Sequence, residues 1–152
     1  MIFIPGNTPS SKNSKIHTKT GGVFMSKTVQ NYLKNAGIQS FSSSKKIVKE
    51  YKTKPNLFRN STEVYFKTLF DFTKGEPCEL GIHFVRGSKH KFDMYNIFQI
   101  IADLLVAHDI IPDDNMDCLV PIPLKIKGQW YSYDKNNPGV YLEILNPNKN
   151  SF

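Results

Sequence analysis

The chain has 152 residues, a hydrophobic fraction of 39% and a formal net charge of +7. This length suits one domain with a single core, and no apolar run approaches the roughly eighteen residues that suggest a membrane helix. We therefore exclude a helical membrane protein and expect a cytoplasmic one with no membrane partner.

The charge is distributed unevenly along the chain. Residues 1–60 contain eleven Lys or Arg and one acid, whereas residues 61–152 contain nine Lys or Arg and twelve acids. Such asymmetry is typical of proteins whose basic part binds nucleic acid. A lysine-rich surface that only faces solvent is the simpler alternative, so charge alone does not decide between the two.

The first predicted elements are a short strand and a helix. Residues 1–5 favour a strand that ends at a proline, and residues 6–19 form a polar stretch without periodicity. Ser26 is the expected N-cap of a helix over residues 27–35, which Gly37 would end.

The pattern is weaker between this helix and residue 76. Residues 40–55 are rich in Ser and Lys and show no periodicity, so we expect an irregular segment there. Apolar residues at helical spacing after Ser61 predict a second helix that ends before Gly75.

The sequence from residue 78 onward predicts a strand, a helix and two further strands. Alternating apolar residues predict a strand over 78–85, and apolar residues at helical spacing predict an amphipathic helix over 93–107. An apolar run over 116–126 predicts a strand at a sheet edge, because it contains two prolines. A final strand is expected over 140–145.

The predicted order is strand, helix, helix, strand, helix, strand, strand. It indicates a mixed α/β (α+β) fold, with a small mixed sheet packed against helices in one domain over residues 1–152. Neither a GxGxxG nor a Walker A sequence is present, so we expect no nucleotide cofactor. Cys78 and Cys118 lack the spacing of a zinc site, which predicts two free, buried thiols.

Aspartates gather around the clearest predicted helix. Asp93 begins it, and Asp113, Asp114 and Asp117 lie between its end and the next strand. If that strand runs back along the helix, the carboxylates approach one another. Magnesium prefers oxygen ligands, and hydrolysis of a phosphodiester needs a metal-activated water. The simpler alternatives are that Asp93 only caps the helix and that Asp113 and Asp114 belong to an ordinary turn.

The same segment resembles the signature of the RusA-type Holliday junction resolvases. In that signature a basic stretch precedes Asp-x-Asp-Asn, an amphipathic helix and an Asp-Asp pair, which here read Asp93-Met94-Tyr95-Asn96 and Asp113-Asp114. The segment Pro9-Ser10-Ser11-Lys12-Asn13 resembles the family's Pro-Ser-x-Asn loop, and the last strand resembles its closing strand. The resemblance covers both ends and residues 78–145, whereas residues 38–60 look like a basic insertion.

Two positions depart from the family pattern. Tyr95 stands where the family has its second aspartate, and Gln99 stands where it has a lysine. A phenol is protonated at neutral pH and cannot replace a carboxylate as a magnesium ligand. The site would then recruit Asp113 or Asp117, hold metal more weakly, or be inactive.

The resemblance implies a magnesium-dependent endonuclease, with Mn²⁺ as a substitute, that resolves four-way or other branched DNA as a homodimer. It also implies a bacterial host and a phage or prophage origin. The expected catalytic residues are Asp93, Asp113 and Asp114, and the expected metal ligands are Asp93, Asp114 and Asp117. Supporting roles fall to Tyr95, Asn96 and Gln99. The expected DNA contacts are Lys12, Asn13, Lys15, Lys19, Lys89, His90 and Lys91.

Two alternative functions and the role of three aromatic residues stay open at this point. The protein could bind junctions on the same fold after losing cleavage, or it could be a basic adaptor without catalysis. The aromatic residues Trp130, Tyr131 and Tyr133 either stack on unpaired bases or pack on the sheet or at a subunit contact.

Overall fold

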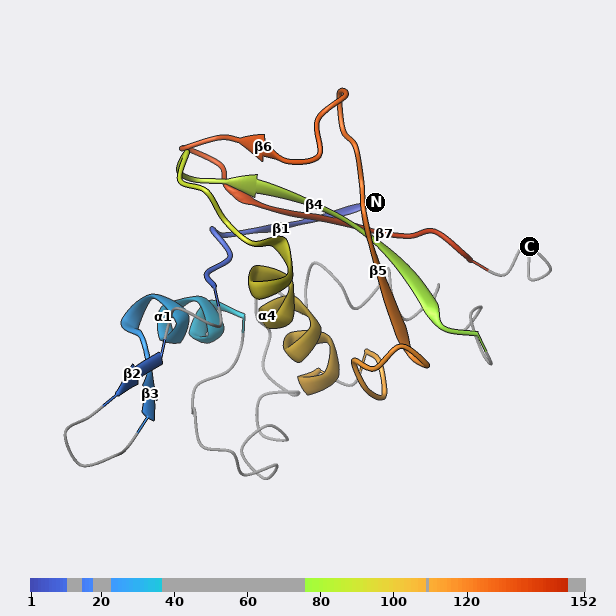
Figure 1. The fold of residues 1–152 in the computed structure, drawn as a ribbon, viewed down its shortest axis with the longest axis horizontal. Coiled ribbons are helices and arrows are strands. Elements are labelled where there is room, and N and C mark those ends of the chain that lie inside the picture. Colours follow the sequence, from blue (N-terminus) through green and yellow to red (C-terminus); the bar gives the residue numbers. More distant parts are fainter. Residues whose placement is uncertain (11–14, 18–22, 37–75, 109, 148–152) are drawn as a thin grey trace.

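The computed structural model describes residues 1–10, 15–17, 23–36, 76–108 and 110–147 (Figure 1). Its elements, in chain order, are β1 (Ile2–Pro5), β2 (Lys15–His17), β3 (Val23–Met25), α1 (Lys27–Asn35), β4 (Cys78–Arg86), α4 (Met94–Ala107), β5 (Leu119–Pro123), β6 (Ser132–Tyr133) and β7 (Gly139–Ile144). They form a mixed α+β fold, as predicted. The helix expected after Ser61 and the irregular segment 40–55 fall outside the described residues. Within the described part, no helix has the length and apolar character needed to cross a membrane.

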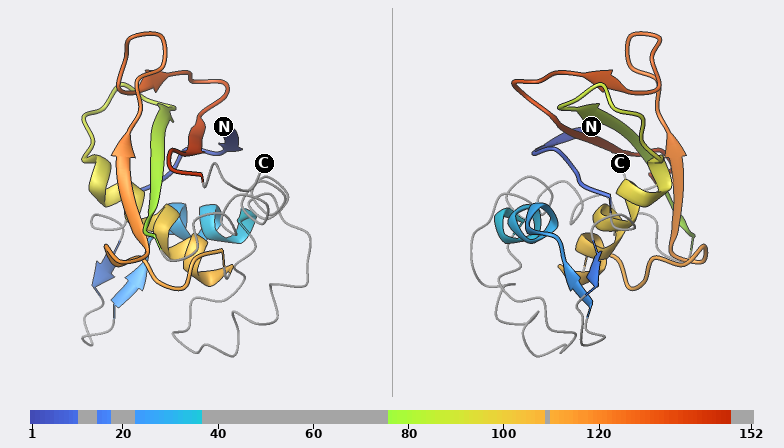
Figure 2. Two further views of the ribbon diagram at one scale, coloured as in Figure 1. Left: turned by 90° about the vertical axis from the view of Figure 1, so that its right-hand side faces the viewer. Right: turned by 60° about the vertical axis from the view of Figure 1, so that its left-hand side comes forward.

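The main sheet has the strand order β1-β7-β4-β5, and β6 pairs with the end of β4. Strand β7 is antiparallel to both β1 and β4, whereas β5 and β6 are parallel to β4. Parallel neighbours need a crossover connection, which α4 supplies between β4 and β5 (Figure 2). Strand β5 therefore runs back along α4, which is the condition stated above for the aspartates to approach one another.

Both described helices lie on the same side of the sheet (Figures 1 and 2). The core between α4 and the sheet contains apolar side chains that are at most 4% exposed: Cys78, Leu80, Ile82, Phe84, Ile97, Ile101, Leu104, Leu105, Val140, Leu142 and Ile144. Helix α1 adds Val29 and Leu33 to it. Burial of this apolar surface is the main term that stabilises the fold.

The helix starts follow the predicted capping chemistry. The Ser26 hydroxyl accepts a hydrogen bond from the Val29 N–H at 3.4 Å, and α1 ends at Asn35 with Ala36 as its C-cap. The Asp93 carboxylate accepts one from the Tyr95 N–H at 3.0 Å at the start of α4. A side-chain oxygen at the N-cap satisfies a donor that the first helical turn leaves free, so the predicted bounds of both helices agree with the structure to within one residue.

Strand β5 is shorter than predicted, and it lies at the sheet edge, as its prolines indicated. The Leu124 N–H donates to the Ile82 carbonyl at 2.8 Å. Alternate residues of a strand point their N–H groups to the same neighbour, so Pro121 and Pro123 face away from β4. A proline costs no ladder hydrogen bond at such a position.

Strand β4 departs from the predicted alternation, because it is buried along almost its whole length on both faces. A β-carbon at Gly81 would meet the Leu124 side chain at 2.7 Å, so Leu124 covers this part of the second face. His83 is fully buried beside it and contacts the Leu124 carbonyl through Nδ1 at 2.9 Å and the Ser132 hydroxyl through Nε2 at 2.7 Å. A carbonyl only accepts, so Nδ1 donates to Leu124.

The second face of β4 is covered by the chain that follows β5. We call residues 124–131 the arm. Its tip is a tight turn at Lys127 and Gly128, which have φ values of 50° and 77°, and Ile126 and Gln129 exchange two backbone hydrogen bonds across it. Two successive positive φ values are typical of a type I′ hairpin turn. The arm then returns to β4 as β6.

The cysteines are both free thiols, as predicted. Cys78 is buried at the start of β4, and this burial, with the nearby negative charge of Glu79, raises its pKa to about 12. Cys118 is only half-buried, so the prediction of burial was correct for the first thiol alone.

Candidate functional site

The Gln99 amide joins two carboxylates on the exposed side of α4. Its Nε2 atom donates to Asp103 Oδ1 at 2.8 Å and to Asp114 Oδ2 at 2.9 Å. Asp103 lies one helical turn after Gln99, whereas Asp114 comes from the loop between α4 and β5. Both oxygens bond to one nitrogen, so they lie no further apart than the sum of the two distances. We call these three residues the Gln99 cluster.

The Gln99 cluster has an electrostatic cost. Asp103 is an exposed residue, but the protein atoms around its carboxyl partly desolvate it and so raise its pKa. The Gln99 hydrogen bond lowers this pKa, and the nearby negative charge of Asp114 raises it, in decreasing order of effect. The net direction is upward, because desolvation and like charge both disfavour a carboxylate. A cation bound between Asp103 and Asp114 would relieve that repulsion.

Asp103 was not predicted from the sequence. The resemblance was drawn only from the aspartate at the start of the helix and from the pair that follows it. The available signal was spacing: residues four apart lie on one helix face, and Tyr95, Gln99 and Asp103 follow that spacing. All three are exposed, so they form one stripe along α4 to which Asp114 is attached.

Asp93 lies outside the Gln99 cluster. Its carboxylate is engaged in capping α4, which agrees with the simpler alternative for this residue. Gln99 is six residues further along the helix, which corresponds to about 9 Å of axial rise. Asn96, the expected supporting residue, is half-buried in the first turn.

The other two candidate aspartates hold the loop before β5 in shape. Asp113 accepts hydrogen bonds from the Asp114 N–H at 2.8 Å and from the Asn115 amide at 2.9 Å. The Asp117 N–H donates to the Asn115 side chain at 3.0 Å. These are the contacts of ordinary turn chemistry, and they orient Asp114 toward Gln99.

The fit to a metal ion rests on two carboxylates. Among the described residues, no three His, Cys, Asp or Glu side chains come close enough to one another to form a metal site. Magnesium is often held by only one or two carboxylates, with water and substrate phosphate completing its octahedron. Asp103 and Asp114 meet that smaller requirement.

A basic turn lies before α4. Its side chains Lys89, His90 and Lys91 are all exposed, as expected for DNA contacts. Of the other expected contacts, Lys12, Asn13 and Lys19 lie outside the described residues. Lys15 belongs to β2, but the structure does not describe its side chain.

The N-terminal loop is fixed against the start of this turn. The Gly6 N–H donates to the Pro138 carbonyl at 2.9 Å, and the Gly87 N–H donates to the Asn7 side chain at 3.0 Å. Arg86 donates to the Thr8 carbonyl at 2.6 Å. The segment that leads to Pro9 and Ser10 therefore lies beside the basic turn, although about eighty residues separate them in sequence.

Arg86 is a cation with incomplete partners. Burial lowers the pKa of its guanidinium. Its Nε atom is buried and has no hydrogen-bond partner among the described residues, and its guanidinium carbon lies 4.9 Å from the centre of the Phe92 ring. Arg86 therefore adds an incompletely paired positive charge next to the basic turn.

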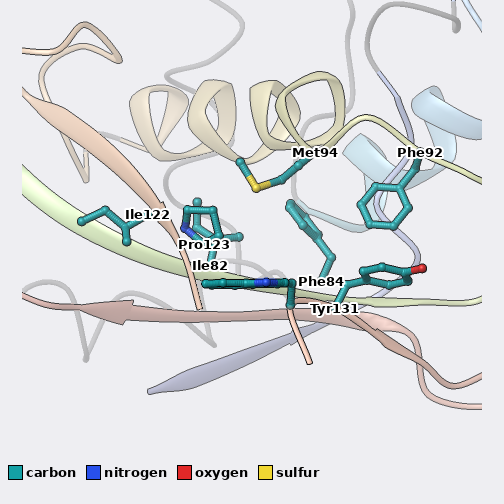
Figure 3. Close-up of a pocket in the computed structure, with 8 residues that line it drawn as sticks. Ile82, Phe84, Phe92, Met94, Ile122, Pro123 and Tyr131 are labelled. Atoms are coloured by element: carbon teal, nitrogen blue, oxygen red, sulfur yellow. The ribbon is translucent and has the colours of Figure 1, made fainter. Parts of the chain in front are cut away.

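An apolar pocket of about 420 Å³ lies between β4, β5, the start of α4 and the arm. Figure 3 shows Met94 and Phe92 on one side of it and Phe84 and Tyr131 on the other. The sequence did not predict this pocket, because its lining residues come from separate segments that only the tertiary fold brings together.

Comparison with the models of known protein families and with curated protein sequences finds no match to this chain.

Proposed function

We propose that this protein is a magnesium-dependent endonuclease of the RusA type that cleaves four-way or other branched DNA as a homodimer. The observation that carries the proposal is the Gln99 cluster. Its Asp114 belongs to the Asp-Asp pair of the sequence resemblance, and it contacts the helix face that contains the family's other motif positions.

The surrounding charge supports the same function. The basic turn, the N-terminal loop and Arg86 lie together before α4. Positive groups of this kind bind the DNA backbone through phosphate contacts that carry little sequence information. Carboxylates beside a cationic surface are the combination that a metal-dependent nuclease needs.

The proposed metal ligands differ from the motif residues, because one of them lies further along α4 than Asp93. We assign Asp103 and Asp114 as the carboxylates that would hold Mg²⁺, and Gln99 as the residue that keeps them in position. Bound magnesium would supply an activated water and would reduce the charge on the leaving oxygen. In the same proposal, Asp93 caps α4 and joins the basic turn to the helix that carries the cluster.

The decisive experiment is cleavage of a synthetic four-way junction in magnesium by the wild-type protein and by Asp114→Asn. The variant should bind the junction at least as tightly, since it removes a negative charge near phosphate, but it should not cleave. Glu143→Gln is the matched control, because it makes the same chemical change on β7, away from the cluster. Cleavage by Asp114→Asn at the wild-type rate would refute the site.

Two observations favour a second candidate function. Tyr95 stands in place of an aspartate and Gln99 in place of a lysine of the family signature. The described residues also contain no cluster of three metal-ligating side chains. A protein that binds junctions without cutting them would show this pattern. Tight, junction-selective binding with no cleavage in either Mg²⁺ or Mn²⁺ would establish this candidate in place of the first.

A further inference from the structure

The apolar pocket lies beside the proposed nuclease site and is not part of it. Figure 3 shows Phe92 and Met94 on one side of the pocket and Phe84 and Tyr131 on the other, and Pro123 and Trp130 also line it. Its volume of about 420 Å³ is within the usual range for sites that bind small molecules or single groups. Met94 directly follows the N-cap of α4, so the pocket opens next to the basic turn.

Two aromatic rings of the pocket remain more than half exposed. Trp130 is 57% exposed and Tyr131 is 53% exposed. Tyr131 is nonetheless held in place, because its ring packs edge to face on Phe92 with 4.9 Å between the ring centres. Large aromatic side chains left in water beside a pocket indicate a binding surface for a ligand or a partner.

Cations lie over the aromatic rings of this surface. Lys125 lies 4.7 Å from the centre of the Trp130 ring, Arg86 4.9 Å from that of Phe92, and Lys89 5.2 Å from that of Tyr133. A surface that offers apolar and aromatic faces together with positive charge fits a ligand with a flat ring and attached negative charge. Nucleotides have this character, and their rings are accessible only when the base is unpaired.

We propose that this pocket receives an unpaired base of DNA, which stacks on Trp130 and Tyr131 while Lys125 and Lys89 contact the flanking phosphates. The inference rests on the proposed function and deepens it, because a base becomes available at a branch point when the protein opens a pair there. Base binding itself requires neither magnesium nor cleavage, so the two proposals can fail separately.

The protein contains its own probe for this site. Trp130 is the single tryptophan of the chain, so all tryptophan fluorescence comes from the pocket. A short oligothymidine should quench and shift this emission without added metal. An oligonucleotide of equal length and charge with abasic sites, and a blunt duplex, should change it much less, because stacking requires an accessible base.

Substitutions separate stacking from general attraction. Tyr131→Ala should weaken binding of a labelled oligothymidine by at least about fivefold, since loss of one stacking ring costs this much or more. Leu145→Ala is the matched control, because it truncates an exposed apolar side chain that does not line the pocket. Lys125→Gln should lower the slope of affinity against salt by about 0.7. Circular dichroism spectra should match for all variants.

The results distinguish the possible occupants. Equal quenching by the abasic oligonucleotide would overturn the proposal, and so would no quenching at all. Self-association that Trp130→Ala abolishes, without a response to DNA, would assign the pocket to a subunit contact instead. Quenching without junction cleavage would remove the proposed function and retain this site, whereas cleavage without quenching would do the reverse.

Discussion

His83 offers a quantitative test of how the arm is held on the sheet. We expect His83→Leu to destabilise the protein, because it leaves the Leu124 carbonyl and the Ser132 hydroxyl without their partner. An unpaired buried polar group costs about 1–3 kcal/mol, and both partner residues are only half-buried, so water satisfies part of the loss. The expected decrease in the free energy of unfolding is therefore about 2–4 kcal/mol, or roughly 5–15 °C in Tm for a chain of this size.

The assay is thermal unfolding followed by circular dichroism, with Trp130 emission recorded in parallel. Ser132→Ala is the graded control, because it removes only the Nε2 contact and should cost about 1 kcal/mol. Emission from His83→Leu should also shift toward that of exposed tryptophan, since the arm loses its attachment. Equal Tm values for His83→Leu and the wild type would refute this account of the arm.

Three further outcomes are expected. Tyr95→Asp adds a carboxylate one turn before Gln99 and should shift junction cleavage to lower magnesium concentrations; no shift combined with weaker DNA binding would contradict this. Asp103→Asn should weaken cleavage at limiting magnesium and reduce the rise in Tm that magnesium gives the wild type, and an unchanged rise would remove Asp103 from the site. Cys78 should resist alkylation in the folded protein, whereas Cys118 should react. The pKa of Cys78 is raised to about 12 in the folded protein, whereas an unfolded thiol ionises near pH 9. The free energy of unfolding should therefore fall as the pH rises from about 9 toward 12. A Cys78→Ala variant with the same alkaline decline would contradict the last expectation.

Local chemistry explains which elements the sequence predicted. The N-caps at Ser26 and Asp93 and the apolar periodicity of α4 are encoded within a few residues, so these helices agree with the prediction. The prolines of β5 likewise identified an edge strand, because a missing N–H has the same consequence in any fold. Strands β2 and β3 were missed, since each has three residues, too few to show a period.

The site required information that no local pattern contains. Asp114 was identified by resemblance, but its partner Asp103 became visible only when the loop after α4 was seen to fold back onto Gln99. The pocket depends in the same way on tertiary contacts, because the return of the arm places Trp130 and Tyr131 beside Phe84, on the face of β4 that packs on α4. The alternation of β4 predicted an exposed face at Gly81 and His83, and tertiary contacts override such a prediction when another segment covers the strand.

The prolines of β5 limit how two copies of this protein can associate. Pro121 and Pro123 point away from β4, so the outer side of β5 presents carbonyl groups without the N–H donors that a further strand would need at those positions. A second copy cannot extend the sheet there by regular pairing, and the same feature discourages aggregation through this edge. The opposite edge is β1, which is only four residues long and ends in Pro5. A homodimer would therefore join through other surfaces, and the side of β5 that adjoins the pocket would remain accessible to DNA.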